Sequence, residues 1–275
     1  MSLTYEERRE TILAELGAKG KVQVHALAGI FNVSTETIRR DLDRLEKEGR
    51  LRKVYGGAVQ TRSERIEPTY LKRSQMHSSE KRAIGKLAAS LVGEGETVLL
   101  DNGTTTIEIM RELKDRADVT VITSSVTILT CALDGFQGKV IFAGGEVNMG
   151  CQASTGAIAH QLLDQFKVNK AFISAGGISL ADGITEYNLE EALLSRKMMQ
   201  RTEEAILVAD HSKFGVTTFA QIAPIEQFSM IVTDPGCSRE WIDALNKLDI
   251  EVLISGTGSW ETDFQEMIVF HPRLC

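Results

Sequence analysis

Five short polar segments of the chain each follow a run of apolar residues, and their side chains could bind a phosphorylated compound that carries hydroxyl groups. They are residues 101–106, 123–125, 143–146, 175–188 and 210–215. Backbone amides and hydroxyls bind phosphate oxygens, lysine adds a positive charge, and carboxylates and amides bind sugar hydroxyls. One such segment alone would indicate only a capped turn. Five of them predict a site for a phosphorylated sugar or polyol.

The first of these segments has the composition of an anion site, because Gly103 permits close approach of the backbone and three threonine hydroxyls follow it. In the last segment, Lys213 adds a point charge for the ligand or, alternatively, forms a salt bridge to Asp210 that only holds the loop. The residues expected to contact the ligand are Asp101, Asn102, Gly103, Thr104, Thr105, Thr106, Thr123, Ser124, Ser125, Gly144, Gly145, Gly176, Gly177, Glu186, Asn188, Asp210 and Lys213.

A second group of residues has the spacing of a helix that reads DNA. Ser34 is a suitable N-cap, and apolar residues recur at helical spacing between Ile38 and Leu45. Arg39 and Arg40 lie near the start of this helix, where their guanidinium groups could reach phosphates or guanine edges in the major groove. Taken alone, such a stretch is more often an amphipathic helix with a solvated face, so its neighbours must decide between the two interpretations.

A basic hairpin follows this helix. Residues 50–55 alternate polar with apolar before two glycines, which predicts a β-hairpin that could lie along the phosphate backbone as a wing. Helix and wing together predict a winged helix-turn-helix that binds double-stranded DNA. The residues expected at this interface are Ser34, Thr35, Glu36, Thr37, Arg39, Arg40, Arg44, Arg52, Lys53, Tyr55, Gly56 and Gly57.

Two further helices must position the DNA-reading helix. The first begins with a capping box at Thr4 and is expected to end at Gly17 and Gly20. The second covers residues 25–31 and ends at Asn32, which is suited to the left-handed conformation of a tight turn. The pattern is therefore helix, tight turn, helix.

The larger part of the chain alternates strands with helices. The expected strands are short, β-branched runs at 97–100, 119–122, 139–142, 171–174, 205–208, 230–233 and 251–254. This alternation predicts a mostly parallel sheet covered on both faces, in which ligands bind beyond the carboxyl ends of the strands. The fold class is thus α/β, with a small DNA-binding domain in front of a larger domain.

The polar residues 61–79 contain Pro68 and are interpreted as a linker, after which Ser78 or Ser79 caps the next helix. The expected boundaries are a DNA-binding domain at 1–60, this linker, a ligand-sensing domain at 80–255 and a C-terminal tail at 256–275.

Composition indicates an ordinary globular α/β protein of 275 residues, 43% hydrophobic and 25% charged. The net charge is −7, but residues 1–60 carry +2 and the remainder −9, so the expected DNA-binding part is the less acidic one. Neither a membrane-spanning stretch nor the apolar core of a signal peptide is found, which predicts a cytoplasmic protein. The four cysteines are widely spaced and no Cys/His cluster occurs, so we expect reduced thiols, no metal site and no cofactor.

The residues described so far carry a family resemblance. Residues 33–58, VSTETIRRDLDRLEKEGRLRKVYGGA, resemble the winged helix-turn-helix of DeoR-family bacterial transcription regulators. That family often has histidine where this chain has Tyr55. The polar segments at 101–106, 122–125, 144–146, 183–192 and 210–215 look like the sensor domain of the same family, so that the resemblance spans roughly residues 4–255.

The resemblance implies a sensor fold similar to ribose-5-phosphate isomerase and glucosamine-6-phosphate deaminase. It also implies a phosphosugar effector and a repressor that binds operator DNA as a homodimer or homotetramer. Two departures fall in the expected pocket: Asn102 stands where serine is usual, and Ser124 where asparagine is usual.

Two hypotheses follow. The first is a transcriptional repressor of a sugar or polyol operon, controlled by a phosphorylated effector. The second is an isomerase-like enzyme fused to a DNA-binding module, in which Asp101, Glu186 or Asp210 beside Lys213 moves a proton. The first is preferred because carboxylates in a pocket do not by themselves make a catalyst.

Overall fold

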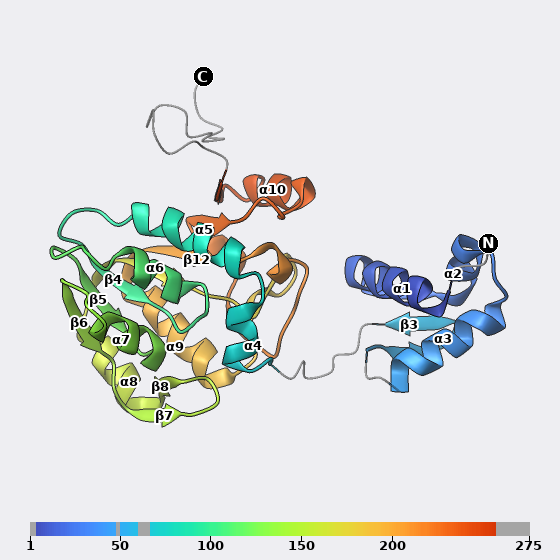
Figure 1. Cartoon of the computed structure of the whole chain (residues 1–275), viewed down its shortest axis with the longest axis horizontal. Helices are drawn as coiled ribbons and strands as arrows, with labels where there is room; N and C mark the ends of the chain where they lie inside the picture. Colours follow the sequence, from blue (N-terminus) through green and yellow to red (C-terminus); the bar gives the residue numbers. More distant parts are fainter. Residues whose placement is uncertain (1–3, 48–49, 60–66, 257–275) are drawn as a thin grey trace, which may run out of the picture. The chain divides into compact units, whose positions relative to one another are not determined.

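The computed structural model of the chain describes residues 4–47, 50–59 and 67–256. They form two compact units that divide between Ile66 and Glu67, here called the N-terminal and C-terminal units (Figure 1). The expected tail lies almost entirely outside the described residues. In the part of the chain that is described, no helix is long and apolar enough to cross a membrane.

The N-terminal unit contains three helices and three short strands in the order expected for a winged helix-turn-helix. They are α1 (Tyr5–Lys19), β1 (Lys21–Gln23), α2 (Val24–Phe31), α3 (Thr35–Lys47), β2 (Arg52–Val54) and β3 (Gly57–Val59). The Thr4–Glu7 capping box is formed at the start of α1. The helix continues through Gly17 and ends only at Gly20, whose left-handed conformation caps it.

The turn between α2 and α3 has the predicted chemistry. Asn32 is left-handed, with φ of 52°, and Ser34 Oγ accepts a hydrogen bond of 3.1 Å from the backbone N–H of Thr37. Ile38, Leu42 and Leu45 of α3 pack fully buried against α1 and α2. The opposite side of α3 is therefore free to carry charged residues.

The wing is one edge of a three-stranded antiparallel sheet in the order β1-β3-β2. Tyr55 and Gly56 form the two-residue loop between β2 and β3. Gly56 has φ of 77°, a left-handed conformation that favours glycine. Gly57 has a different cause: a Cβ there would lie 2.0 Å from the carbonyl oxygen of Val22. Pairing of β1 with β3 thus requires a glycine at this position.

The C-terminal unit is built on a seven-stranded parallel sheet, and all seven predicted strands take part in it. They are β4 (Thr97–Leu100), β5 (Thr120–Thr123), β6 (Lys139–Phe142), β9 (Val168–Ile173), β12 (Thr202–Val208), β14 (Met230–Thr233) and β15 (Glu251–Ile254). Their order is β15-β14-β12-β9-β4-β5-β6, and every pairing is parallel. The predicted α/β fold class is confirmed.

Helices cover both faces of this sheet, because alternate strand residues point to opposite sides. Val98 and Leu100 pack with α5 (Ser78–Ser90), α6 (Thr106–Glu112) and α7 (Val126–Leu133). Leu99 and Leu207 pack on the other side with α8 (Gly156–Leu163), α9 (Leu189–Gln200) and α10 (Arg239–Asn246). Figure 1 shows these helices around the sheet.

Smaller elements that the sequence did not predict extend the loops at the carboxyl ends of the strands. A hairpin joins β7 (Glu146–Asn148) to β8 (Ala153–Thr155). A second antiparallel sheet has the order β10-β11-β13, formed by Gly177–Ser179, Gly183–Glu186 and Ala220–Ala223. The single-turn 3-10 helices η1 (His211–Lys213) and η2 (Ile225–Gln227) complete the unit.

The predicted linker is partly wrong. Residues 60–66 lie outside the described residues, but α4 (Tyr70–Gln75) falls within the remainder, in the C-terminal unit. Glu67 pairs with Arg73 at 2.8 Å, and Lys81 of α5 donates to the Arg73 carbonyl at 2.6 Å, so polar contacts rather than an apolar stripe hold this helix. Helix α5 begins directly after His77, which has φ of 51° and is its N-cap in place of the expected serine.

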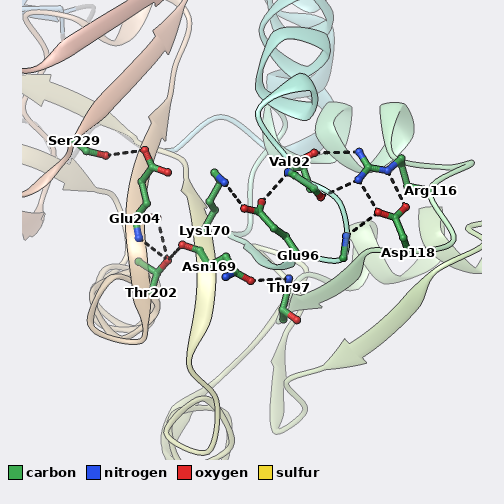
Figure 2. A network of polar contacts seen from close by, with 12 residues as sticks. Val92, Glu96, Thr97, Arg116, Asp118, Asn169, Lys170, Thr202, Glu204 and Ser229 are labelled. Atoms are coloured by element: carbon green, nitrogen blue, oxygen red, sulfur yellow. Dashed lines mark hydrogen bonds and ion pairs between the residues drawn. The ribbon is translucent and has the colours of Figure 1, made fainter.

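The amino ends of the strands are joined by a network of satisfied polar contacts (Figure 2). Lys170 Nζ lies 2.5 Å from Glu96 Oε1, and the Thr97 N–H donates to Asn169 Oδ1 at 3.0 Å. Arg116 donates to both carboxylate oxygens of Asp118 and to two backbone carbonyls. The polar side chains named here at the amino edge of the sheet therefore bind one another and leave no polar group for a ligand.

Candidate functional site

The strand order reverses at β4 and β9, and this is where a ligand crevice is expected in an open parallel sheet. From β4 the chain continues through β5 to β6 on one side, then returns to β9 on the other side and proceeds outward. A Cβ at Gly103 would lie 2.8 Å from the Ser174 side chain, so the loops after β4 and β9 meet closely.

Asp101, at the end of β4, holds these loops together. Its Oδ2 accepts hydrogen bonds from the Ser174 N–H at 3.1 Å, from Ser174 Oγ at 3.2 Å and from Ser195 Oγ at 3.0 Å, while Oδ1 accepts from the Asn102 N–H. The carboxylate therefore ties β4 to β9 and α9. Both of its oxygens are already engaged, which makes Asp101 a positioning group for the predicted site.

Asn102 and Glu191 form a second buried pair beside it. Asn102 Nδ2 donates to Glu191 Oε1 at 2.7 Å and to the carbonyl oxygen of Cys151 at 3.0 Å. Asn102 Oδ1 and Glu191 Oε2 are buried and have no partner in the described part of the chain. Both atoms are left for a ligand or a water. Glu191 was not among the predicted site residues, although it lies three residues after Asn188.

Unpaired buried polar atoms gather at this edge of the sheet, in contrast to the amino edge. Four other strands also end in, or are soon followed by, a residue whose side-chain oxygen is buried and unpaired. These residues are Ser124, Asp210, Thr233 and Ser255. Ser154, whose N–H donates to the carbonyl of Ser124, adds another. Buried polar groups are almost always paired in native proteins, so such a concentration indicates a site that binds a polar ligand or water.

The threonines of the first loop divide into two kinds. Thr106 Oγ1 is occupied, because it donates to the carbonyls of Asp101 and Gly103. The hydroxyls of Thr104 and Thr105 have no hydrogen-bond partner among the described residues, although both side chains are buried. These two hydroxyls remain candidates for binding a ligand.

The second and third loops contribute less than predicted. Thr123 Oγ1 donates across the sheet to the Leu100 carbonyl, and Ser125 caps α7. Of this trio, only the Ser124 hydroxyl is unpaired. In the third loop, Gly145 has φ of 151°, and a Cβ there would lie 3.0 Å from Ser154 Oγ; Gly144 precedes it.

The segment at 175–188 contains both residues of the candidate site and residues that only maintain the fold. Glu186 is buried, and a Cβ at Gly176 would lie 2.8 Å from its Oε1. Gly177 instead starts β10, where a Cβ would meet the carbonyl oxygen of Val216. Asn188 is the N-cap of α9 and accepts from two backbone N–H groups, so the structure gives its side chain a structural contact.

Lys213 forms no ion pair with Asp210 in the described chain, so the alternative of a loop-holding salt bridge is not observed. Its charge acts on Glu186 and Lys81. Lys81 of α5 was not predicted: it is 4% exposed, donates to the Arg73 carbonyl at 2.6 Å and lies within electrostatic range of Asp210. One feature of the sequence could have indicated its burial: Lys81 lies three residues before Ile84, on the apolar side of the helix.

Burial shifts the ionisation of this site. It raises the pKa values of Asp101, Glu186 and Glu191 to about 7, and Glu191 and Glu67 add like-charge repulsion at Glu186. Burial also lowers the pKa of Lys81 to about 8. A cluster of strongly shifted groups beyond strand ends is characteristic of a functional site.

The predicted DNA-reading face of α3 is exposed. Arg39 and Arg40 have side chains 55% and 79% exposed, each 3.6 Å from Glu36 in a weak surface ion pair. Ser34 and Thr37 hydrogen-bond each other, and Thr35 is half-buried beside them. Both guanidinium groups are thus free to contact DNA.

Other predicted DNA contacts have partners inside the unit. Arg44 stacks over the ring of Tyr5 at 4.3 Å, and Lys53 is paired with Asp43 of α3. Arg52 and Tyr55 of the wing are exposed. The pairing of Lys53 fixes the wing to α3 and orients its exposed residues.

A buried ion pair that sequence analysis missed joins α1 to α3. Arg8 Nε donates to Asp41 Oδ2 at 2.7 Å, and both side chains are less than 10% exposed. Asp41 raises the pKa of Arg8 further through this hydrogen bond. The pair fixes α3 from its buried side.

A winged helix-turn-helix together with an α/β unit that gathers buried polar groups at the carboxyl ends of its strands defines the class of two-domain DNA-binding regulators. Residues 8–64 match the DeoR-like helix-turn-helix domain, and residues 76–235 match the DeoR C terminal sensor domain. The chain belongs to the DeoR family of transcriptional regulators.

Similar proteins cover nearly the whole chain. A putative aga operon transcriptional repressor from Escherichia coli O157:H7 is 33% identical over 252 residues, 91% of this chain and 94% of that protein. The HTH-type transcriptional repressor GlcR from Bacillus subtilis (strain 168) is 32% identical over 250 residues, 91% and 96% of the two chains. Among solved structures, ribose 5-phosphate isomerase A from Methanocaldococcus jannaschii matches with a TM-score of 0.39 and 19% identity, covering 50% and 55%. That likeness is too distant to support a functional argument.

Proposed function

We propose that a phosphorylated sugar or polyol binds at the carboxyl ends of the parallel strands and controls the binding of operator DNA by α3 and the wing. The observation that carries the effector site is the concentration of unpaired, buried polar atoms at this edge of the sheet. Lys81 and Lys213 supply positive charge for a phosphate, and Asn102, Glu186 and Glu191 supply partners for hydroxyl groups.

The DNA-binding part of the proposal rests on the exposed arginines of α3 and on the wing. Paired recognition helices read half-sites about one helical turn apart, so the protein acts as a homodimer or homotetramer. The effector shifts the population of arrangements of the oligomer, and its affinity is coupled to that of DNA. The role is regulation without turnover, because both matching family models describe domains of transcriptional regulators. Asp101, one of the three candidate bases, moreover already accepts four hydrogen bonds.

A panel of pentose and hexose phosphates is expected to contain a compound that raises the thermal unfolding temperature of the full chain, because a ligand of the folded state stabilises it by mass action. The parent sugar and inorganic phosphate at the same concentration should have much smaller effects. The same compound should change the affinity for operator DNA. If no phosphorylated sugar does either, the effector proposal fails.

The Lys81→Met variant provides the site-specific comparison for this panel. It should keep its fold and lose most of the stabilisation by the phosphorylated compound, because the buried positive charge is gone. Lys114→Met removes an equally charged but exposed side chain and should respond like the wild type. Equal responses of both variants would place the ligand elsewhere.

The stability of the C-terminal unit is expected to fall as pH rises from about 5 to 8. The folded-state pKa values of Asp101, Glu186 and Glu191 lie near 7, above their unfolded values, so the folded state binds more protons in this range. Their contribution to stability is complete below the unfolded pKa values and is lost as pH passes 7. Urea unfolding followed by tryptophan fluorescence reports on this unit, since both tryptophans follow residue 67.

Glu186→Gln should flatten this pH dependence, whereas Glu190→Gln, at an exposed position nearby, should leave it unchanged. A stability that rises steadily from pH 5 to 8 in the wild type would contradict the assigned burial of these carboxyl groups.

A further inference from the structure

Two histidines and a carboxylate meet at the end of β12, outside the Asp101–Glu191 group, and the carboxylate, Asp210, is also one of the predicted effector contacts. His77, Asp210 and His211 each offer one possible ligand atom, and these atoms all lie within 4.8 Å of one another. The rings of His77 and His211 are edge to face, with centroids 4.8 Å apart. The three residues come from the N-cap of α5 and from the loop that contains η1.

His211 is held in the orientation of a metal ligand. Its Nδ1 lies 2.8 Å from Oδ2 of the buried Asp234, whose Oδ1 also accepts from the His211 N–H at 2.7 Å. The hydrogen bond to Asp234 assigns the proton to Nδ1 and leaves Nε2 as the free lone pair. A carboxylate behind a histidine is the usual outer shell of a metal site. Gly236 leaves room for this pair, because a Cβ there would lie 2.5 Å from His211 Nδ1.

Asp210 supplies an unused oxygen. Its Oδ1 accepts from the backbone N–H and hydroxyl of Ser212, at 3.1 and 2.5 Å. Its Oδ2 is buried and has no hydrogen-bond partner among the residues that the structure describes, and the residue as a whole is 1% exposed. A buried carboxylate oxygen without a donor is costly unless a cation or a ligand completes it.

His77 is half-buried and adopts the left-handed conformation, with φ of 51°. This conformation turns the chain directly before α5 and brings the imidazole against His211. Glu80 Oε1 lies 4.0 Å from His77 Nδ1, so a further carboxylate is close by.

We propose that His77, Asp210 and His211 bind one divalent transition-metal ion of the type of Zn²⁺. Two imidazole nitrogens and one carboxylate oxygen suit Zn²⁺ and leave a fourth position open, whereas Mg²⁺ prefers oxygen ligands throughout. Lys81 lies within electrostatic range of Asp210, so the binding energy must come from strong bonds to the imidazole nitrogens, which Zn²⁺ forms and Mg²⁺ does not. This inference goes beyond the proposed effector control and does not depend on which sugar phosphate binds.

Isothermal titration of the full chain with Zn²⁺, without any sugar phosphate, is expected to show one site per chain, and Mg²⁺ should give no such site. His77→Asn keeps a residue that tolerates the left-handed conformation, and His211→Gln keeps a polar side chain. Each variant should weaken Zn²⁺ binding at least about tenfold. His160→Asn removes a histidine of the same unit outside the cluster and should bind like the wild type.

Circular dichroism and thermal unfolding identify variants that fold normally. Co²⁺ in place of Zn²⁺ should give a visible absorption band in the wild type that both cluster variants lack. The proposal is overturned if wild-type protein binds no stoichiometric Zn²⁺, or if folded His77→Asn and His211→Gln proteins bind it with unchanged affinity. The effector panel, run with a chelator present, tests the sugar-phosphate site separately.

Discussion

The Arg39→Ala, Arg40→Ala double variant is expected to bind operator DNA at least about a hundredfold more weakly than the wild type. Both side chains are more than half exposed on the face of α3 away from the core, and their only ion pair in the described residues is the weak contact with Glu36. An arginine that contacts a base or a phosphate contributes about 1–3 kcal/mol, so two of them account for a loss of this size. Folding should be unaffected, because neither side chain packs in the unit.

The affinity is measured by titrating DNA fragments that the wild-type protein has selected from a random pool, at fixed salt concentration. Lys114→Ala with Arg239→Ala removes the same two charges from exposed positions of the C-terminal unit and serves as the control. The sugar-phosphate response of the double variant should remain. Undiminished DNA binding would show that α3 does not read the operator.

Asp41→Ala is expected to destabilise the N-terminal unit by about 3 kcal/mol, because it leaves the Arg8 guanidinium buried without its carboxylate. A unit of this size has only a few kcal/mol of stability, so much of it should unfold. Hydrogen exchange of peptides from α1 and α3 measures the effect within the full chain. DNA binding should fall as a consequence.

Asp43→Ala is the matched control, since Asp43 lies two residues further along the same helix and its side chain is 50% exposed. Its ion pair with Lys53 should contribute no more than about 1 kcal/mol. Arg8→Met combined with Asp41→Leu should recover most of the lost stability, because an apolar pair replaces the buried charges. Equal effects of Asp41→Ala and Asp43→Ala would refute the assigned importance of burial.

The elements that local chemistry defines were predicted from the sequence. The seven strands of the main sheet are β-branched runs, and the turn before α3 needs only Asn32 and Ser34. Elements that depend on tertiary contacts were not predicted. Helix α4 carries no apolar stripe and is held by the contact of Lys81 with the Arg73 carbonyl, while most strands outside the main sheet contain a single β-branched residue.

For the candidate site, the sequence predicted where the polar residues lie better than it predicted what each side chain contacts. Polar residues after strand ends indicated the edge of the sheet at which unpaired buried polar atoms gather, yet Asp101, Thr106 and Asn188 are bonded within the protein. Lys81 and Glu191 were missed, because nothing in a helical pattern tells whether a charged residue will be buried at a site. The Arg8–Asp41 pair was missed for the same reason.

The amino and carboxyl edges of the main sheet are expected to differ in how they tolerate substitutions. Contacts such as Lys170–Glu96 and Arg116–Asp118 lock the amino edge, far along each strand from the residues proposed to bind the effector. If the effector binds at the carboxyl edge as proposed, substitutions at Asn102 and Ser124 are expected to alter ligand preference without disturbing the amino edge. The proposed division of the sheet into a fixed edge and a ligand-binding edge predicts that variants at these two positions can be screened for binding of other phosphorylated compounds.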